Sequence, residues 1–334
     1  MNRGISGSTL VLLLVRMIIG VTKKQALRTV LLNKKVIIQI LSGEPRMAKF
    51  DLSVLTVTLD QPVEKAYQVY CEYGGVLIKG LFTDYIDALN NELEPYISAR
   101  HPGIDSLPEH MKDFAGRKTK RLTQVPLISK TFRESMIDHP YLMGCIDKIF
   151  ENICDATWMN TTQIMQVEPG EKAQFLHRDS ENYQIIRRMG KSAPEVTSNC
   201  IVALDDITED MGATRVVAGS HLWDDFDRQA AYEETFPLEL KKGDGFLFSG
   251  KVIHGAGANV SGKPRRAMAM AFNAGWLTPE EAFPMYMKWE MVKGLSQRAQ
   301  QLLGFRSFHH TCLEGGSLWT VNFEELANYL EHAE

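Results

Sequence analysis

The sequence predicts a mainly β fold with flanking helices, whose core is a jelly roll, the double-stranded β-helix made of two sheets. Short apolar stretches recur between residues 161 and 273, and turn signals separate them. Helical periodicity is confined to the segments before and after this region. The chain has 334 residues with 44% apolar content, and no part of its middle is typical of a linker. A series of short strands packed beneath earlier helices indicates a double-sheet jelly roll.

The first 46 residues differ from the rest in charge and hydropathy. They hold eight basic residues against the single acid Glu44, a local net charge of +7 in a chain whose net charge is −4. The apolar run Thr9–Val21 is shorter than the roughly 20 residues that a membrane-spanning helix needs. We therefore expect residues 1–46 to be an N-terminal extension, either non-catalytic or a targeting or membrane-surface segment. Residues 47–334 are predicted to form one domain.

The domain is predicted to begin with a helix that leads into a strand. Apolar residues recur at helical spacing over residues 63–70, and a pair of glycines separates them from the strand-like residues 76–78. Thr83 or Asp84 is predicted to cap the next helix, whose apolar stripe lies within residues 85–93.

The next segments are predicted to be a loop and then a helix. Residues 101–130 are polar, interrupted by prolines and basic at their centre, which indicates a long surface loop. Helical periodicity returns over residues 132–153. Two closing helices are expected near the end of the chain, over residues 297–305 and 323–330.

The strands of the predicted jelly roll follow Asp155. Each is a short apolar stretch, and turn signals such as Pro169-Gly170 and Gly243-Asp244 lie between them. The predicted strands are Thr161–Val167, Phe175–Asp179, Asn199–Leu204, Thr214–Val217, Phe246–Ser249, Val252–His254 and Arg266–Asn273.

Three residues of these strands are candidate metal ligands. In a strand alternate side chains share a face, so the triplet His177-Arg178-Asp179 directs His177 and Asp179 to one side. His254, in a second strand, is the predicted third ligand. Two imidazoles and one carboxylate leave one face of the ion open, which suits non-haem Fe(II) that must also bind an oxidant and a co-substrate.

A basic pair follows His254 and offers an anchor for a carboxylate co-substrate. Arg265 shares its strand face with small residues up to Asn273, whereas Arg266 shares the other face with Met268, Met270 and Phe272. A barrel interior that holds an ion and two small molecules needs small side chains. We therefore expect Arg265 to point inward and bind the carboxylate by a two-pronged hydrogen bond, with Arg266 as the alternative.

Several short blocks share the pattern of one enzyme family: Thr119–Thr123, Gln174–Asp179, Gly212–Arg215, Gly219–His221, Lys242–Asp244, His254–Gly257, Leu277–Glu280 and Gly304–Ser307. From about Leu52 to about Leu330 the chain resembles the phytanoyl-CoA dioxygenase-like branch of the Fe(II)/2-oxoglutarate dioxygenases, which have a cupin-like core. It is most similar there to fungal enzymes that oxidise meroterpenoids. The resemblance implies Fe(II) and 2-oxoglutarate as cofactors and O2 as co-substrate. It places Arg265, Gln174 and Thr214 on 2-oxoglutarate, and it implies a homodimer.

The resemblance further implies oxidation of a polycyclic fungal natural product, a meroterpenoid intermediate, by hydroxylation, desaturation or ring rearrangement. Thr197 and Asn199 share one strand face, and Ala271 and Asn273 lie beyond Arg265 on the inward face, so these four are pocket candidates. The alternatives are a hydroxylase of fatty acyl-CoA or of an alkaloid, and a non-catalytic partner of an active homologue.

Composition restricts the partners and the compartment. A net charge of −4 argues against nucleic acid as the main partner, because a phosphate-binding surface needs clustered positive charge. Five cysteines, an odd number without a C-x-x-C pair, predict reduced thiols. We therefore expect an intracellular, cytoplasmic protein that binds a small-molecule substrate. Residues 1–46 are the segment that would target it or bring it to a membrane.

Overall fold

The computed structural model describes residues 50–308 and 317–333, which fall within one compact unit, Phe50–Glu334. The predicted extension over residues 1–46 lies outside the described residues and stays a prediction. No helix in the described part of the chain is long and apolar enough to cross a membrane.

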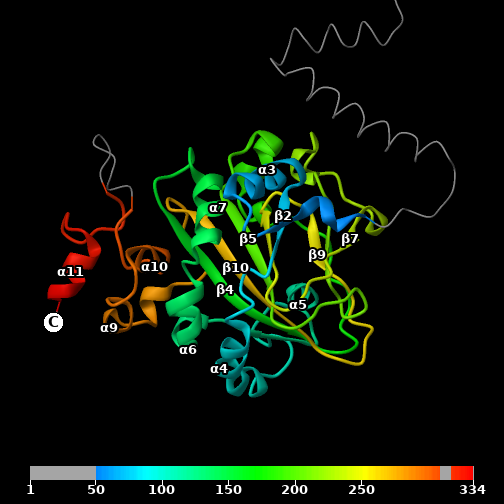
Figure 1. The fold of residues 1–334 in the computed structure, drawn as a ribbon, viewed down its shortest axis with the longest axis horizontal. Helices are drawn as coiled ribbons and strands as arrows, with labels where there is room; N and C mark the ends of the chain where they lie inside the picture. Colours follow the sequence, from blue (N-terminus) through cyan, green and yellow to red (C-terminus); the bar gives the residue numbers. More distant parts are fainter. Residues whose placement is uncertain (1–49, 309–316, 334) are drawn as a thin grey trace, which may run out of the picture. The chain divides into compact units, whose positions relative to one another are not determined.

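Two β-sheets form the core of this unit (Figure 1). Within the described residues the large sheet has seven strands in the order β1-β2-β8-β5-β10-β4-β3, and the small sheet has the order β7-β6-β9. The large sheet is mixed, because β1 pairs with β2 in parallel and its other pairings are antiparallel. The small sheet is antiparallel. The strands are β1 (Thr56–Thr58), β2 (Gly75–Lys79), β3 (Thr119–Leu122), β4 (Thr157–Val167), β5 (Thr197–Ala203), β6 (Thr214–Val216), β7 (Phe236–Pro237), β8 (Gly245–Ser249), β9 (His254–Ala256) and β10 (Arg265–Ala274). The predicted fold class, a mainly β core with flanking helices, is confirmed.

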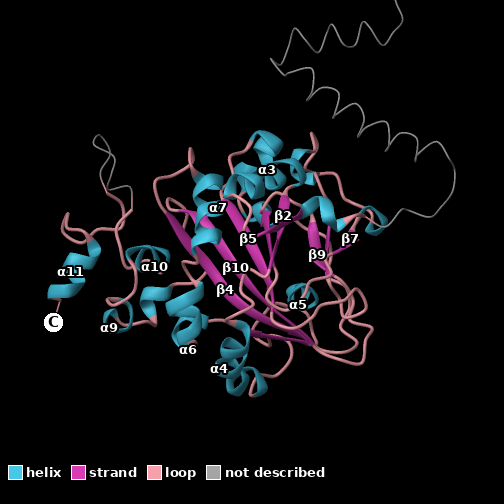
Figure 2. Ribbon diagram, in the orientation of Figure 1, coloured by secondary structure: helices cyan, strands magenta, loops and turns pink. Residues whose placement is uncertain are grey.

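Helices flank the strands (Figure 2). Helices α3, α4, α6 and α10 contact strands of the large sheet, and α7 packs on α3. The α-helices are α3 (Val63–Tyr73), α4 (Ile86–Ser98), α5 (Glu109–Ala115), α6 (Val125–Ile128), α7 (Pro140–Phe150), α8 (Gln184–Met189), α9 (Trp289–Val292), α10 (Gln297–Leu302) and α11 (Leu326–His332). Residues 132–136 form one π-helical turn before α7.

The end of α3 shows how tightly the first helix is joined to the sheets. Gly74 adopts a left-handed conformation with φ +83°, and its N–H donates to the carbonyl of Tyr70 at 2.7 Å. A Cβ at this position would lie 2.3 Å from Cγ2 of Val252, so only glycine fits. The two predicted elements, a helix followed by a strand, are therefore present and joined at the glycine pair.

The apolar face of β10 supports the alternation argument. Met268, Met270 and Phe272 are fully buried and belong to the main hydrophobic cluster beneath the helices. Ala269, on the other face, is only partly buried and lines a cavity. One face of β10 thus contributes to the packed core, and the other faces open space.

Two sequence predictions about local structure are wrong. Residues 101–130 are not one long loop, because they contain α5, β3 and α6. Strand β3 is an edge strand paired only with β4, which accounts for its polar sequence. Neither Thr83 nor Asp84 caps α4, which begins at Ile86 without a side-chain cap. Backbone bonds close that turn instead, including Phe82 N–H to the carbonyl of Gly243 at 2.8 Å.

The predicted strand Phe175–Asp179 is also wrong as a regular strand. It makes a single bridge, between His177 and His254, and the chain then enters a 3-10 turn at Asp179–Asn182. The His177 and His254 backbones exchange both hydrogen bonds of that bridge, at 2.9 and 3.0 Å. Pairing ends there because the chain must turn to bring Asp179 toward the two histidines.

Candidate functional site

The three predicted metal ligands lie together at the edge of the small sheet. His254 is the first residue of β9, His177 is its bridge partner, and Asp179 begins the following 3-10 turn. The Nε2 atom of His177 lies 3.4 Å from Oδ1 of Asp179, and Nε2 of His254 lies 3.6 Å from Oδ2. One ligand atom from each residue falls within 4.8 Å of the others. The arrangement can hold one metal ion.

Backbone carbonyls fix which nitrogen of each histidine faces the centre. Nδ1 of His177 lies 3.1 Å from the carbonyl oxygen of Phe175, and Nδ1 of His254 lies 3.1 Å from that of Val252. A carbonyl oxygen can only accept, so each Nδ1 carries the proton and donates it. Both Nε2 atoms then face Asp179, and each neutral imidazole offers its Nε2 electron pair to a metal ion.

Burial and the three ligands' own charges shift their pKa values. Burial lowers the pKa of His254 below its usual value, and the opposing charge of Asp179 does not reverse this. Burial also acts to raise the pKa of Asp179, but the two histidines and a hydrogen bond from Asn199 hold it below its usual value. Burial opposes protonation of His177, yet the hydrogen bond and charge of Asp179 leave its pKa raised. A carboxylate between two imidazoles is the set that binds a dication.

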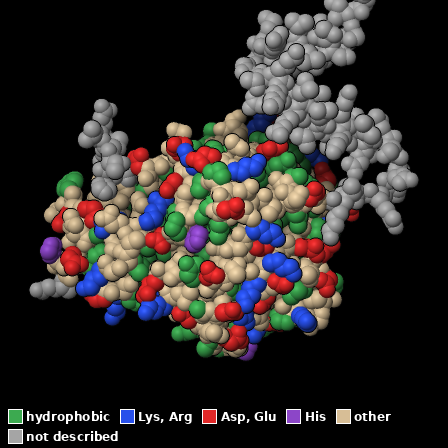
Figure 3. Space-filling model, in the orientation of Figure 1, with side chains coloured by type: hydrophobic (Ala, Val, Ile, Leu, Met, Phe, Trp, Pro, Cys, Tyr) green, Lys and Arg blue, Asp and Glu red, His purple; other side chains and the backbone are tan. Residues whose placement is uncertain are grey.

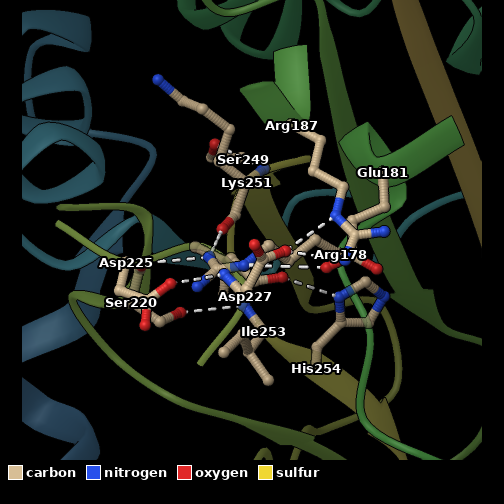
Figure 4. A network of polar contacts seen from close by, with 11 residues as sticks. Arg178, Glu181, Arg187, Ser220, Asp225, Asp227, Ser249, Lys251, Ile253 and His254 are labelled. Carbon is tan, nitrogen blue, oxygen red and sulfur yellow. Dashed lines mark hydrogen bonds and ion pairs between the residues drawn. The ribbon is translucent and has the colours of Figure 1, made fainter. Parts of the chain in front are cut away.

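Arg178, between two of these ligands, is a residue that the sequence argument did not assign a role. Its side chain is 2% exposed and donates to the carbonyl oxygens of Ser220, at 2.9 Å, and Lys251 (Figure 4). Ser220 Oγ in turn accepts from the N–H of Ile253 at 2.8 Å, next to His254. The guanidinium also lies over the Phe226 ring at 4.1 Å. Arg178 therefore holds the His177–Asp179 turn against the segment that carries His254.

Arg265 lies on the cavity side of β10, as alternation predicts. It is 2% exposed, and its Nη1 donates to the carbonyl of Gly212 at 2.5 Å. Its Nε has no hydrogen-bond partner within residues 50–308 and 317–333. Burial, with a smaller contribution from the charge of Arg121, lowers the pKa of Arg265 to about 10, so the group stays charged at neutral pH. Arg266 points elsewhere, to Gln166 and to Glu94, 2.9 Å from Oε2.

The other two residues predicted to contact a co-substrate also reach the cavity. Thr214, the first residue of β6, and Gln174 both line it. The Gln174 amide is already in use, because it donates to the carbonyl of Phe114 at 3.0 Å and accepts from the N–H of Ala256 at 3.2 Å. Gln174 thus joins the α5 segment to β9 beside His177.

The cavity has a volume of about 490 Å³ and lies between the sheets, because strands of both contribute to its wall. The predicted pocket residues Thr197, Asn199 and Ala271 line it. Asn273 does not; it is fully buried and donates to Asn160 Oδ1 at 2.9 Å and to the Tyr183 hydroxyl at 3.0 Å. Asn273 therefore holds Asn160 and Tyr183, two residues of the cavity wall, by hydrogen bonds without lining the cavity itself.

The segment over residues 104–121 forms a second wall that the sequence did not define. Ile104, Leu107, Met111 and Phe114 give it an apolar surface. The Phe114 ring meets the His177 ring edge-on, with centroids 4.9 Å apart. Such a cover keeps water from one side of the metal site. The helical spacing of Leu107, Met111 and Phe114 is the sequence pattern that could have indicated this apolar wall.

The residues present fit an iron ion and a dicarboxylate co-substrate. Two neutral imidazole nitrogens and one carboxylate are ligands that Fe(II) accepts, and they occupy one side of the centre. The buried Arg265 offers an unpartnered Nε–H beside the same cavity, and such a donor needs an acceptor. A bound carboxylate satisfies it.

Comparisons with known proteins found a family model and similar chains. The chain matches the phytanoyl-CoA dioxygenase family, PhyH, over residues 70–267. Dioxygenase aneA of Aspergillus aculeatus is 39% identical over 81% of this chain and 92% of that protein. Dioxygenase FUM3 of Gibberella moniliformis is 36% identical over 82% and 92%, and multifunctional dioxygenase prhA of Penicillium brasilianum is 30% identical over 86% and 95%. A solved structure of HygX from Streptomyces hygroscopicus, with nickel, 2-oxoglutarate and hygromycin B bound, is 15% identical, covers 64% of this chain and 87% of that chain, and has a TM-score of 0.49.

The family match covers more than half of the chain, and the fungal relatives align along most of their own length. The matched region includes the predicted ligands His177, Asp179 and His254, together with Arg265. The chain therefore belongs to the phytanoyl-CoA dioxygenase family and is a dioxygenase.

Proposed function

We propose that this dioxygenase depends on Fe(II) and 2-oxoglutarate, with O2 as co-substrate, and that it oxidises a small natural product. One observation carries the proposal: the convergence of two Nε2 atoms and one carboxylate on a point beside a cavity that also holds the buried Arg265. Such a set leaves coordination positions open for a chelating co-substrate and oxygen.

Each residue of the site has a distinct task. His177, Asp179 and His254 hold the iron, and Arg265 binds the distal carboxylate of 2-oxoglutarate, beside Thr214 and Gln174. Bound iron and 2-oxoglutarate supply the oxidising power that removes a hydrogen atom from an unactivated carbon. Phe114 excludes water beside His177, and Arg178 fixes the turn that carries two of the ligands. The chain thus binds, orients and shields, and the outcome depends on how the substrate's carbon is placed.

The proposed substrate is a polycyclic natural product. Fungal relatives named dioxygenases, one of them a multifunctional dioxygenase, support an oxidative reaction. Within that reaction class we propose a meroterpenoid intermediate as the substrate. The rival, an acyl-CoA, is weakened by the state of the basic residues that would bind its phosphates. Arg117 pairs with Glu109 and Asp113, and Arg187 pairs with Asp227 at 2.7 Å. On the face in Figure 3, blue and red side chains are interspersed, with no extended basic area.

The metal-and-co-substrate proposal has a direct spectroscopic test. Anaerobic addition of Fe(II) and then 2-oxoglutarate should produce the visible charge-transfer band of the chelate in the wild type. Asp179→Ala should abolish the band, and Arg265→Ala should raise the 2-oxoglutarate concentration needed for it at least tenfold. Arg266→Ala is the matched control and should behave as the wild type. Absence of the band from wild-type protein with confirmed bound iron would refute the co-substrate.

Two further parts of the proposal have their own tests. The enzyme acts alone, so succinate should form without a second dioxygenase chain. Succinate that appears only with a co-purifying homologue would instead indicate a non-catalytic partner. We also propose a homodimer, supported by bulky aromatic side chains that the described C-terminal segment leaves exposed, Trp319 at 50% and Phe323 at 100%.

A further inference from the structure

One short turn holds the chain on both sides of a candidate metal ligand. This 249–251 turn lies at the end of β8. The carbonyl of Gly250 accepts from the N–H of Ser180 at 2.9 Å, and the carbonyl of Lys251 accepts from the guanidinium of Arg178 (Figure 4). Both donors are almost fully buried, with Ser180 1% and Arg178 2% exposed. Two consecutive carbonyls of the turn therefore fix the residues immediately before and after the ligand.

That ligand, Asp179, depends on this support because regular pairing of its segment ends earlier. The bridge between His177 and His254 is the last pairing before the chain enters the 3-10 turn. Among residues 178–180, the N–H of Ser180 makes the only main-chain hydrogen bond to another segment within the described ranges. The 249–251 turn therefore decides where the backbone of Asp179 lies.

The same turn leads directly to another candidate ligand, His254. The N–H of Val252 donates to the carbonyl of Ser249 at 3.0 Å, which closes the turn. The carbonyl of Val252 then accepts from Nδ1 of His254 at 3.1 Å, which fixes the imidazole ring. A displacement of the turn would move Asp179 through its two neighbours and His254 through the chain. The turn is therefore a common support for two of the three ligands.

Two buried side chains hold the turn in place. The Ser249 hydroxyl accepts from the N–H of Lys251 at 3.0 Å and donates to the carboxylate of Glu195 at 2.5 Å. The Lys251 ammonium donates to the carbonyl of Ala193 at 2.9 Å. Ser249 is fully buried, and Lys251 is 9% exposed, which is rare for a lysine. Both side chains thus join the turn to residues 193–195, which precede β5.

The middle of the turn packs directly against β5. The N–H of Gly250 donates to the carbonyl of Thr197 at 2.9 Å, and a Cβ on Gly250 would lie 2.3 Å from Cγ2 of Thr197. Thr197 lines the cavity. Steric contact therefore limits movement of the turn toward the cavity wall, and the hydrogen bonds of Ser249 and Lys251 hold it against that wall.

We propose that Ser249 and Lys251 are positioning residues of the metal site, although neither side chain lines the cavity. They fix the turn, and the turn holds Asp179 and His254 at the separation that a metal ion requires. Groups beyond the ligands that orient them change metal affinity by about tenfold to a hundredfold when they are removed. This inference rests on the proposed function, because the ligands are those of the same iron site.

The test compares Ser249→Ala with Ser198→Ala, a matched control. Ser198 on β5 is the register partner of Ser249 and is also fully buried. It also makes two hydrogen bonds, donating to the carbonyl of Phe248 at 2.9 Å and accepting from the Tyr70 hydroxyl at 3.2 Å. These bonds lead to β8 and α3, not to the 249–251 turn. The two variants should therefore lose similar stability in thermal unfolding of the metal-free protein and should differ at the metal site.

Fe(II) affinity is measured without oxygen by competition with a chelating dye. Ser249→Ala should lower the affinity at least tenfold, whereas Ser198→Ala should change it less than threefold. Lys251→Met keeps the hydrocarbon stem and removes the ammonium, so it should also lower the affinity at least tenfold. The visible spectrum of Co(II) bound in place of iron depends on ligand geometry. It should change in Ser249→Ala and Lys251→Met and stay as in the wild type in Ser198→Ala.

The outcomes separate this inference from the proposed function. Equal Fe(II) affinities of Ser249→Ala and Ser198→Ala would overturn the inference, as would wild-type affinity and Co(II) spectrum in Lys251→Met. Failure of both turn variants to fold, beside a folded Ser198→Ala, would leave the turn a structural role only and would also overturn it. A wild type that binds Fe(II) no better than Asp179→Ala would refute the iron site and this inference together. Iron binding that depends on Asp179 but gives no chelate band would refute the co-substrate alone.

Discussion

Asn199 shows how a single side chain in the second layer supports a metal ligand. Its Nδ2 donates to Oδ2 of Asp179, which directs the carboxylate toward the two histidines. The two residues are 20 positions apart and come from β5 and the 3-10 turn. No sequence pattern marks this pair, because each belongs to a different element.

We predict that Asn199→Ala lowers Fe(II) affinity by about tenfold to a hundredfold. The reason is that Asp179 loses its orienting donor while all three ligands stay in place. Competition with a chelating dye measures the affinity. Asn182→Ala, which removes another amide from the cavity wall, is the control and should change the affinity little. Equal affinities for wild type and Asn199→Ala would contradict the assigned role.

Glu195 is a partly buried acid that does not line the cavity. It accepts from the Ser249 hydroxyl at 2.5 Å, and its Oε1 has no partner in the ranges that the structure describes. Burial, only partly offset by the charge of Lys251, raises the pKa of Glu195 to about 7 from 4.5. The unfolded carboxyl loses its proton near 4.5, whereas the folded one keeps it until about 7. The unfolded state therefore binds fewer protons in this window, and stability falls as pH rises through it.

We predict that Glu195→Gln removes this pH-dependent loss. Relative to the wild type, the free energy of unfolding of the variant should improve by up to about 3 kcal/mol between pH 4.5 and 7.5. Urea unfolding at several pH values measures it. Glu233→Gln, on an exposed turn, should follow the wild-type pH profile. If the free energies of unfolding of the wild type and Glu195→Gln depended on pH in the same way, the pKa of the Glu195 carboxyl would not be raised by folding.

At the scale of elements, turns set the position of the strands that carry the site. Gly212 precedes β6 with φ +82°, and its carbonyl accepts from Arg265. A Cβ there would lie 2.6 Å from the carbonyl oxygen of Gly257. Gly219 follows β6 with φ +77°, but open space surrounds it. The two glycines therefore share a backbone conformation and differ in packing.

Alanine at these two positions separates backbone strain from steric contact. Gly219→Ala should cost about 1–2 kcal/mol, the cost of a left-handed conformation alone. Gly212→Ala should cost at least twice as much, and it should also weaken 2-oxoglutarate binding because the Gly212 carbonyl moves away from Arg265. Thermal unfolding and the chelate band measure these effects. Equal losses of stability would show that the turn before β6 relaxes freely.

The segment over residues 101–130 shows where element prediction from sequence failed. Its polar residues indicated a loop, yet it contains β3 at the edge of the large sheet and α5 over the cavity. Edge strands tolerate polar side chains because one side is open. Its secondary structure was therefore predicted incorrectly, and the structure places part of the segment in the cavity wall.

At the scale of the whole molecule, the exposed aromatic residues of the C-terminal segment support self-association. Trp319 and Phe323 adopt positive φ values of 60° and 65°, which bulky residues rarely do. Phe323 is fully exposed. Burial of such apolar side chains against a second surface stabilises the associated state.

We predict a dimer of the 37.7 kDa chain in light scattering at micromolar concentration. Phe323→Ser should shift the equilibrium toward the monomer, because it removes apolar area from the proposed contact. Val260→Ser, which removes another exposed apolar side chain, is the control. A monomer mass for the wild type would remove the dimer from the proposal.

The sequence by itself determined the fold class, the family and the candidate residues of the metal site. It could do so because each depends on local pattern: alternation placed Arg265 opposite Met268 and Met270, and the spacing of His177 and Asp179 marked a ligand pair. Alternation along β10 follows from the geometry of a strand and needs no knowledge of what packs beside it. His177 and Asp179, in contrast, converge through a single bridge and the 3-10 turn at Asp179–Asn182.

Only the tertiary structure decided the environment of those residues. It placed Phe114 on His177, Asn199 on Asp179 and Arg178 on the carbonyls of Ser220 and Lys251. It also made Glu281 a structural acid, which accepts from the N–H of Thr162. These relations join residues far apart in the chain, and whether a polar group is satisfied depends on every element around it. Local pattern therefore identifies which residues carry the chemistry, whereas long-range packing decides which partners hold them and which remain free to bind.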